Sequence, residues 1–273
     1  MSAAHVVERI DFDALLDALA RRGYTIVGPT VRDQAIVYDE IASSMDLPVG
    51  WTDEQEAGQY RLRRRDDEAL FGYAVGPHSW KQYQLPAEVK LWRARVDQDG
   101  ALSDVTEPAR DTPRYAFLGA RSCELHAIGI LDRVLLGGSH TDPADSARTQ
   151  DLFIVAVQCG EAGGTCFCVS MKTGPVAERG FDLALTEVLE ERRHYFVVEV
   201  GSERGADVLA EVPHTPPTSQ NQLAIEQDLR GVVERHVGLP DEELKLICEQ
   251  AIRNHDPCIS CATHFLDLTV DRR

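Results

Sequence analysis

The centre of the chain alternates short apolar runs with an amphipathic stretch, and this alternation restricts the fold more than any other feature. Residues 115–119 and 152–158 are apolar runs without charge, typical of strands that are buried on both faces. Between them, residues 121–135 carry leucine and isoleucine at helical spacing. Strands that alternate with helices predict a mixed or largely parallel sheet covered by helices. This is an α/β fold, with α+β as the alternative.

The flanking sequence predicts further elements of the same body. Leucines at helical spacing before a glycine indicate a helix near the amino terminus, and β-branched runs indicate strands. The first two of these strands are expected to form a small sheet. The predicted elements are a helix at 11–23, strands at 25–27, 35–38 and 89–96, a hairpin or loop at 97–113, a short helix or irregular segment at 181–193, a strand at 195–200 and a helix at 203–212.

The composition changes sharply at residues 214–221, where proline and polar residues replace the preceding apolar pattern. Such a stretch is typical of a linker, so we predict an α/β domain over residues 1–212 and a tail over residues 213–273. Helical spacing on both sides of Pro240 predicts that the tail is a small helical C-terminal segment.

Charge and composition narrow the possible functions. The 273 residues carry a formal net charge of −17, which argues against nucleic acid and against an anionic membrane surface as partners. No apolar run approaches the ~20 residues of a membrane span, and the first residues lack the order of a signal peptide. We therefore expect a cytoplasmic protein. Seven cysteines in a reducing compartment indicate metal ligation or buried thiols before disulfides.

Residues 61–68 form a charge-dense run, Arg-Leu-Arg-Arg-Arg-Asp-Asp-Glu. One interpretation is a patch that docks an acidic partner or a nucleotide phosphate. The other, which we favour, is the solvated face of a hairpin or helix.

Four cysteines are expected to meet at one edge of the predicted sheet. Cys123 begins the helix after the first buried strand, and Cys159 follows the next strand. The carboxyl ends of neighbouring parallel strands share an edge, where α/β folds place their sites. A glycine-containing loop then leads to Cys166 and Cys168, and its length allows a return to this edge. Four thiolates suit an iron–sulfur cluster or a structural zinc ion, and simple burial of the thiols is a third interpretation.

A second metal motif lies near the end of the chain, within residues 256–264. There Cys258, Cys261 and His264 follow the spacing Cys-x2-Cys-x2-His. Cysteines separated by two residues can turn both sulfurs toward one ion, so the motif predicts metal binding.

The end of the chain resembles the carboxy-terminal end of the large subunit of nickel–iron hydrogenases. The likeness rests on that motif and on residues 217–222, 225–229 and 252–256 before it. It implies that Cys258 is a terminal nickel ligand and that Cys261 bridges nickel and iron, both at the catalytic centre. It further implies that His264 lies at a magnesium site and that residues 265–273 are a tail removed in maturation. The two upstream cysteines that complete the nickel site in that family have no match here.

Residues 1–212 resemble the amino-terminal half of the beta subunit of sulfhydrogenases, a family related to one of the components of anaerobic sulfite reductase. The motifs are Ser-Trp-Lys at 79–81, Gly-Ala-Arg-Ser-Cys-Glu at 119–124, Val-Gln-Cys at 157–159 and Cys-Phe-Cys at 166–168. The family commonly has aspartate where this chain has Glu124. Its 4Fe–4S clusters are assigned to a second half with Cys-x2-Cys-x2-Cys-x3-Cys-Pro runs, and this chain contains no such run.

Together the resemblances imply a component of a cytosolic nickel–iron hydrogenase or sulfhydrogenase complex, an oxidoreductase that acts on dihydrogen. Its partners would be other hydrogenase subunits, and its cofactors a nickel–iron centre, a 4Fe–4S cluster and magnesium. Because half of the nickel ligands have no match, we expect the isolated chain not to be catalytic. The alternatives are a non-catalytic docking or assembly protein of such a complex, and a truncated or fused remnant that holds zinc or no metal.

Overall fold

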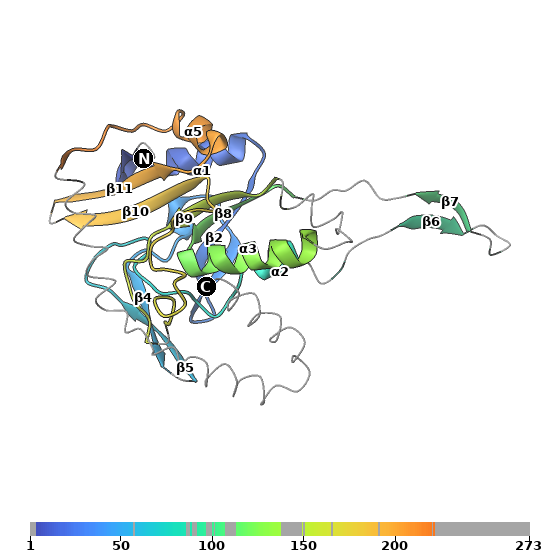
Figure 1. The fold of residues 1–273 in the computed structure, drawn as a ribbon, viewed down its shortest axis with the longest axis horizontal. Helices are drawn as coiled ribbons and strands as arrows, with labels where there is room; N and C mark the ends of the chain where they lie inside the picture. The colour runs from blue at the N-terminus through green and yellow to red at the C-terminus, as the bar shows by residue number, and fades with distance from the viewer. Residues whose placement is uncertain are drawn as a thin grey trace.

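The computed structural model describes residues 4–56, 58–85, 88, 92–96, 100, 102–106, 113–137, 149, 151–164, 166–190, 192–219 and 221. Its body is a seven-stranded sheet in the order β1-β11-β10-β9-β8-β2-β3 (Figure 1). The strands are β1 (Ala4–Glu8), β2 (Thr25–Arg32), β3 (Ala35–Glu40), β8 (Tyr115–Ala120), β9 (Phe153–Val157), β10 (Leu183–Glu190) and β11 (Arg193–Val200).

The four central strands, β10, β9, β8 and β2, run parallel to one another, while β3, β11 and β1 are antiparallel to their neighbours. This mixed sheet confirms the predicted α/β class. The strands predicted at 25–27 and 35–38 are β2 and β3, but they do not form a small sheet of their own. The prediction was wrong on this point because β2 pairs with β8, about 90 residues away along the chain (Thr25 with Tyr115).

Helices cover both faces of the sheet. The helices α1 (Phe12–Arg21) and α5 (Glu203–Leu209) lie on one side, and α3 (Ser122–Leu136) lies on the other (Figure 1). Side chains alternate along β9 between the two faces. Phe153, Val155 and Val157 therefore belong to the core under α1, whereas Ile154 and Ala156 belong to the core under α3. The helices predicted at 11–23, 121–135 and 203–212 are confirmed.

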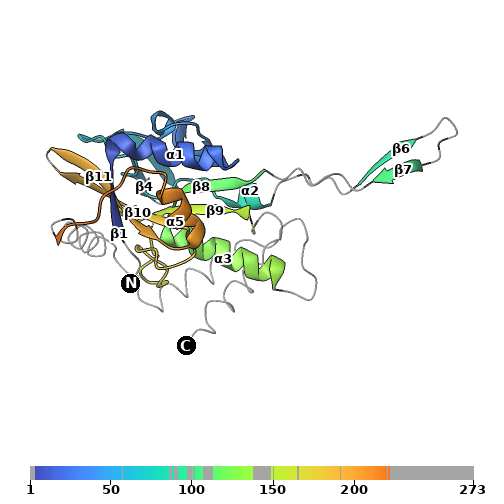
Figure 2. The ribbon, with the colours of Figure 1, turned by 90° about the horizontal axis from the view of Figure 1, so that it is seen from above.

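The remaining elements are small. Two 3-10 turns are present: η1 (Arg9–Asp11) directly precedes α1, and η2 (Ser44–Asp46) follows β3. A hairpin of β4 (Trp51–Glu56) and β5 (Gln59–Arg64) precedes the short helix α2 (Lys81–Gln84). A second hairpin, β6 (Arg93–Val96) and β7 (Leu102–Thr106), projects from the body in both Figure 1 and Figure 2. It lies within the strand predicted at 89–96 and the hairpin or loop predicted at 97–113.

The prediction for residues 181–193 was wrong, because this segment contains strand β10. Its leucine, alanine and glutamate residues are good helix formers, which hid the strand. Residues 183–186 are all buried, since β10 lies between β9 and β11 and both of its faces are covered. Tertiary context decides such segments, because strand preference depends on the neighbours more than on the residue.

The described structure ends shortly after the predicted linker begins. Thr215 pairs with Val6 through two backbone hydrogen bonds of 2.8 and 2.9 Å, so the chain returns to the edge strand β1 before residue 217. The predicted helical tail lies outside the described residues, and the division into 1–212 and 213–273 stays a prediction. None of the helices in the described part of the chain is long and apolar enough to cross a membrane.

Candidate metal centre

The two strands that precede Cys123 and Cys159 are neighbours. In the parallel pair β8–β9, Leu118 lies opposite Val155 and Ala120 opposite Ala156, so both strands end at the same edge. Cys123 follows in the first turn of α3, and Cys159 follows β9 after one residue. The sheet therefore places both thiols at its carboxyl edge, where a parallel sheet offers room for a site.

The loop after Cys159 returns to the same corner of the molecule. A Cβ added at Gly174 would lie 3.1 Å from the Cys168 sulfur and 3.5 Å from Cβ of Ser122, the residue before Cys123. A Cβ added at Gly163 would lie 3.4 Å from the Cys166 sulfur. The loop thus packs closely against the start of α3 at Gly174, where an added Cβ would crowd the Cys168 sulfur.

Burial controls the protonation of all four thiols. It raises the pKa of Cys123 well above its usual range and that of Cys159 to about 11, and it also raises the pKa values of Cys166 and Cys168. The charge of Glu124 raises the pKa of Cys123 further, followed by coupling to the other three thiols, so the four thiols lie within electrostatic reach of one another. In the described residues, however, no three His, Cys, Asp or Glu side chains are gathered closely enough to hold a metal ion.

Arg121 is a buried cation beside these thiols. Its side chain is 1% exposed, and Nη1 donates to the Gln158 carbonyl at 2.7 Å. Nη2 donates to the carbonyls of Phe71 at 2.7 Å and Tyr73 at 3.0 Å. Among the described residues, Nε has no hydrogen-bond partner and the guanidinium forms no ion pair with a carboxylate. The carboxylates of Glu124 and Asp53 interact with this charge electrostatically but do not reach ion-pair distance. A buried cation without a direct ion pair is costly, so this group favours an additional anionic partner.

Glu124 positions the start of the helix that carries Cys123. As the third residue of α3, it accepts a hydrogen bond from the Arg121 backbone N–H at 2.9 Å, which is half of a capping box. Its other oxygen accepts from the Tyr38 hydroxyl at 2.6 Å, and Trp80 stacks on the Tyr38 ring with centroids 3.8 Å apart. Burial raises the pKa of Glu124. Trp80, the tryptophan of the Ser-Trp-Lys motif, therefore packs on the tyrosine that holds Glu124 in place.

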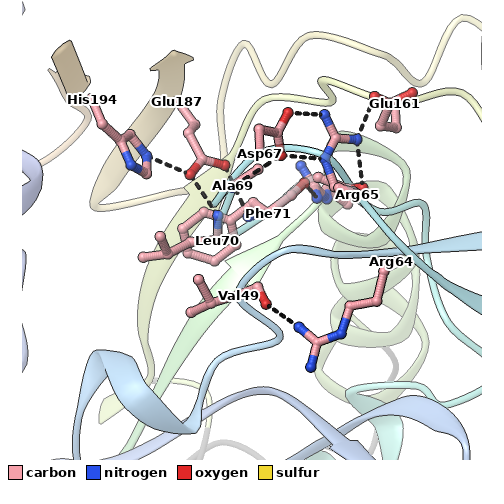
Figure 3. A network of polar contacts seen from close by, with 12 residues as sticks. Val49, Arg64, Arg65, Asp67, Ala69, Leu70, Phe71, Glu161, Glu187 and His194 are labelled. Carbon is pink, nitrogen blue, oxygen red and sulfur yellow. Dashed lines mark hydrogen bonds and ion pairs between the residues drawn. The ribbon is translucent and has the colours of Figure 1, made fainter. Parts of the chain in front are cut away.

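A segment that we call the strap, residues 65–73, runs between Glu187 on β10 and Arg121 after β8, both at the carboxyl edge of the sheet. Figure 3 shows its contacts with Glu187. Glu187 on β10 accepts from the backbone N–H groups of Leu70 at 2.6 Å and Phe71 at 2.8 Å. His194 Nε2 lies 2.8 Å from the same carboxylate. The strap is therefore held by Glu187 on one side and by Arg121 on the other.

Arg65 fixes the start of the strap to the cysteine loop. Its guanidinium donates to Asp67 at 2.7 Å and to Glu161, in the loop that follows Cys159, at 2.7 Å (Figure 3). The charge-dense run at 61–68 thus consists of the exposed β5 strand and this ion pair, which confirms the hairpin interpretation. The Arg65–Glu161 contact also ties the loop after Cys159 to the strap, which Glu187 holds against β10.

The structure thus brings four predicted site residues to one corner and adds neighbours that the sequence analysis missed. These neighbours are Tyr38, Arg121, Glu124 as a cap, and Glu187. The only sequence signal for two of them was their place beside Cys123 in the run 119–124. The second predicted set, Cys258, Cys261 and His264, lies outside the described residues.

Comparison with known proteins finds similarity to two kinds of sulfhydrogenase subunit, beta and alpha. The chain is 35% identical over 109 residues to the beta subunit of sulfhydrogenase 2 from Pyrococcus furiosus, covering 40% of this chain and 30% of that subunit. It is 33% identical over 90 residues to the alpha subunit of sulfhydrogenase 1 from the same organism, covering 33% of this chain and 20% of that subunit. The chain therefore spans less than a third of either relative, and no family model matches it.

Proposed function

We propose that this chain is a component of a cytoplasmic hydrogenase-type oxidoreductase complex, in which its body holds an iron–sulfur cluster and its tail contributes to a nickel site. Similarity to both a beta and an alpha subunit of sulfhydrogenases supports the class of complex. The observation that carries the cluster is the corner where Cys123, Cys159, Cys166 and Cys168 lie within electrostatic reach of one another beside Arg121.

In number and chemical type, the donors suit a group held by four thiolates, and the thiols would have to close around it to bind. Buried thiols with raised pKa values stay protonated at neutral pH, and a metal ion bound to sulfur displaces those protons. An iron–sulfur cluster with four cysteine ligands carries negative charge, which the buried guanidinium of Arg121, with its unbonded Nε–H, would offset. When bound, the cluster would supply one-electron transfer. Arg121 would neutralise its charge, and the strap would limit the access of water.

Metal analysis of anaerobically purified protein tests the proposal. We expect about four iron and four sulfide per chain and an EPR signal on reduction, as for a 4Fe–4S centre. The Cys159→Ser variant should lose most of both, because a serine hydroxyl is a poor iron ligand. Cys248→Ser is the matched control, since Cys248 belongs to neither cysteine set. Zinc in place of iron and sulfide would contradict the proposal.

The tail is tested separately. By resemblance, Cys258 and Cys261 are nickel ligands at a catalytic centre and His264 lies at a magnesium site. We expect Cys261→Ala to abolish bound nickel in the assembled complex, while iron and sulfide in the body remain. Nickel retained unchanged in this variant would reject the ligand assignment.

A second candidate is a docking or assembly protein without a metal of its own. It is favoured by the spacing of the thiols, since no three potential ligands in the described part of the chain are gathered at one point. The same metal analysis separates the two functions, because a docking protein purified without oxygen would contain neither iron nor zinc.

A further inference from the structure

The hairpin of β6 and β7, with Trp92 before it, forms an arm that leaves the body of the molecule. Figures 1 and 2 show it from two directions, and in both it projects well beyond the sheet and helices. Its strands pair with each other, Arg93 opposite Thr106 and Val96 opposite Leu102, in a sheet of two strands only. A two-stranded sheet without a covering layer is marginally stable in water, so this arm needs a partner surface.

Apolar side chains gather on one face of the arm. Cross-strand partners point to the same face of a two-stranded sheet, so Val96 and Leu102 share a face, and Trp92 directly precedes β6. The irregular register between the two strands turns Val105 to this face as well. These four side chains are 57%, 62%, 62% and 63% exposed, respectively. Exposed residues of this size grouped on one element mark an interaction surface.

The opposite face of the arm is cationic. Arg93 and Arg95 alternate with the apolar residues of β6, and both are exposed. Arg95 Nη1 lies 3.5 Å from Asp104 Oδ2 and forms an ion pair. Arg93 has no ion pair among the described residues. Tryptophan and arginine are the residue types that carry most binding energy at protein interfaces. The arm therefore fits an apolar groove whose rim carries carboxylates.

We propose that this arm inserts its apolar face into a groove on another subunit of the hydrogenase-type complex, with the arginines on the carboxylate rim. This inference rests on the proposed function, since the similarity to subunits of multi-subunit enzymes identifies the kind of partner. A specific interface buries roughly 800 Å² on each partner, and a groove that encloses the arm buries both of its faces, whereas a flat contact buries one.

Photo-crosslinking in the organism of origin tests the arm. A benzophenone amino acid replaces Val105 in the full chain, and the adduct is identified by mass spectrometry. We expect one main adduct, with a hydrogenase subunit recognised by its own sequence. The matched control carries the same amino acid at Met45, which is 81% exposed on the body, and should lack this adduct. An adduct with a second copy, with an unrelated protein, or no adduct at Val105 would each overturn the proposal.

Substitution of the arm gives an independent test. In the variant with Val96→Ser, Leu102→Ser and Val105→Ser, we expect co-purification of that subunit to fall at least tenfold. The melting temperature of the purified chain should stay unchanged, because these residues are exposed. The control variant, Ile10→Ser with Met45→Ser, should co-purify normally. Iron and sulfide measured in the same samples keep the two proposals apart: a filled cluster without the adduct refutes only the arm, and the adduct without a cluster refutes only the metal site.

Discussion

Replacing Arg121 with methionine tests whether the buried guanidinium holds the candidate metal centre together. Methionine keeps much of the volume but removes the charge and every donor. Three carbonyls, those of Gln158, Phe71 and Tyr73, then lose their hydrogen bonds inside the protein. An unsatisfied buried polar group costs about 1–3 kcal/mol, and part of that loss is recovered because the buried charge itself is gone.

We therefore expect Arg121→Met to lower the free energy of unfolding by about 3–5 kcal/mol, a large share of a typical domain's stability. The assay is chemical denaturation of the metal-free chain under reducing conditions, followed by both fluorescence and circular dichroism. Measuring the metal-free chain separates the effect of the hydrogen bonds from that of cluster loss. Arg121→Lys keeps the charge but not the forked geometry, so its stability should fall between those of the native chain and Arg121→Met.

Arg114→Met serves as the matched control. Arg114 is 45% exposed and bonds to the Arg22 carbonyl and the Tyr24 hydroxyl, so its loss should lower stability by about 0.5 kcal/mol. A loss below about 1 kcal/mol in Arg121→Met would refute the reasoning, because it would mean that the strap and the strand ends do not depend on the guanidinium.

Three smaller predictions follow from the surroundings of this site. Tyr38→Phe removes the 2.6 Å hydrogen bond to buried Glu124 and should lower the free energy of unfolding by about 2 kcal/mol in a denaturant titration; no change would contradict a stabilising role for this bond. Gly174→Ala sets a Cβ 3.1 Å from the Cys168 sulfur, so we expect reduced iron content with normal overall folding by circular dichroism. The hydrogen bond from Arg65 holds the pKa of Asp67 below 3.8, so the pair stabilises the fold above that pH and the contribution is lost as pH falls through the folded pKa. Asp67→Asn should therefore cost about 0.5 kcal/mol at pH 7 and progressively less as the pH falls below 3.8 in urea titrations, allowing for solvent screening.

The sequence was most informative where local pattern and tertiary role agree. The unbroken apolar run of β9 and the helical spacing of α3 predicted both elements, and the position of Cys159 after one strand predicted the shared edge. Strand β10 was missed because its residues favour helix in isolation, and only its neighbours on both sides make it a strand. The small-sheet prediction for β2 and β3 was wrong because strand pairing between distant segments leaves no local signal.

The neighbours of the site were harder to predict than its cysteines. The partners of Arg121 are carbonyl groups of Phe71 and Gln158, 50 and 37 residues away, and every residue has such a carbonyl. Backbone acceptors carry no side-chain pattern, so the sequence cannot show which of them a buried arginine will meet. Glu124 stood out only as a departure from the family's usual aspartate, yet its longer side chain lets it cap α3 and also reach Tyr38.

A single bound group would stabilise both the buried charge of Arg121 and the buried thiols at the candidate metal centre. Arg121 is buried without a direct ion pair in the described structure, and the four thiols nearby are buried with pKa values raised by burial. Each set alone admits an ordinary explanation, since carbonyls can solvate an arginine and thiols often pack as apolar groups. Side by side, the arginine favours negative charge and the thiols need a metal cation before they can carry it. A metal–thiolate group supplies both at once, which is why this corner, rather than the count of cysteines, supports the proposed cluster.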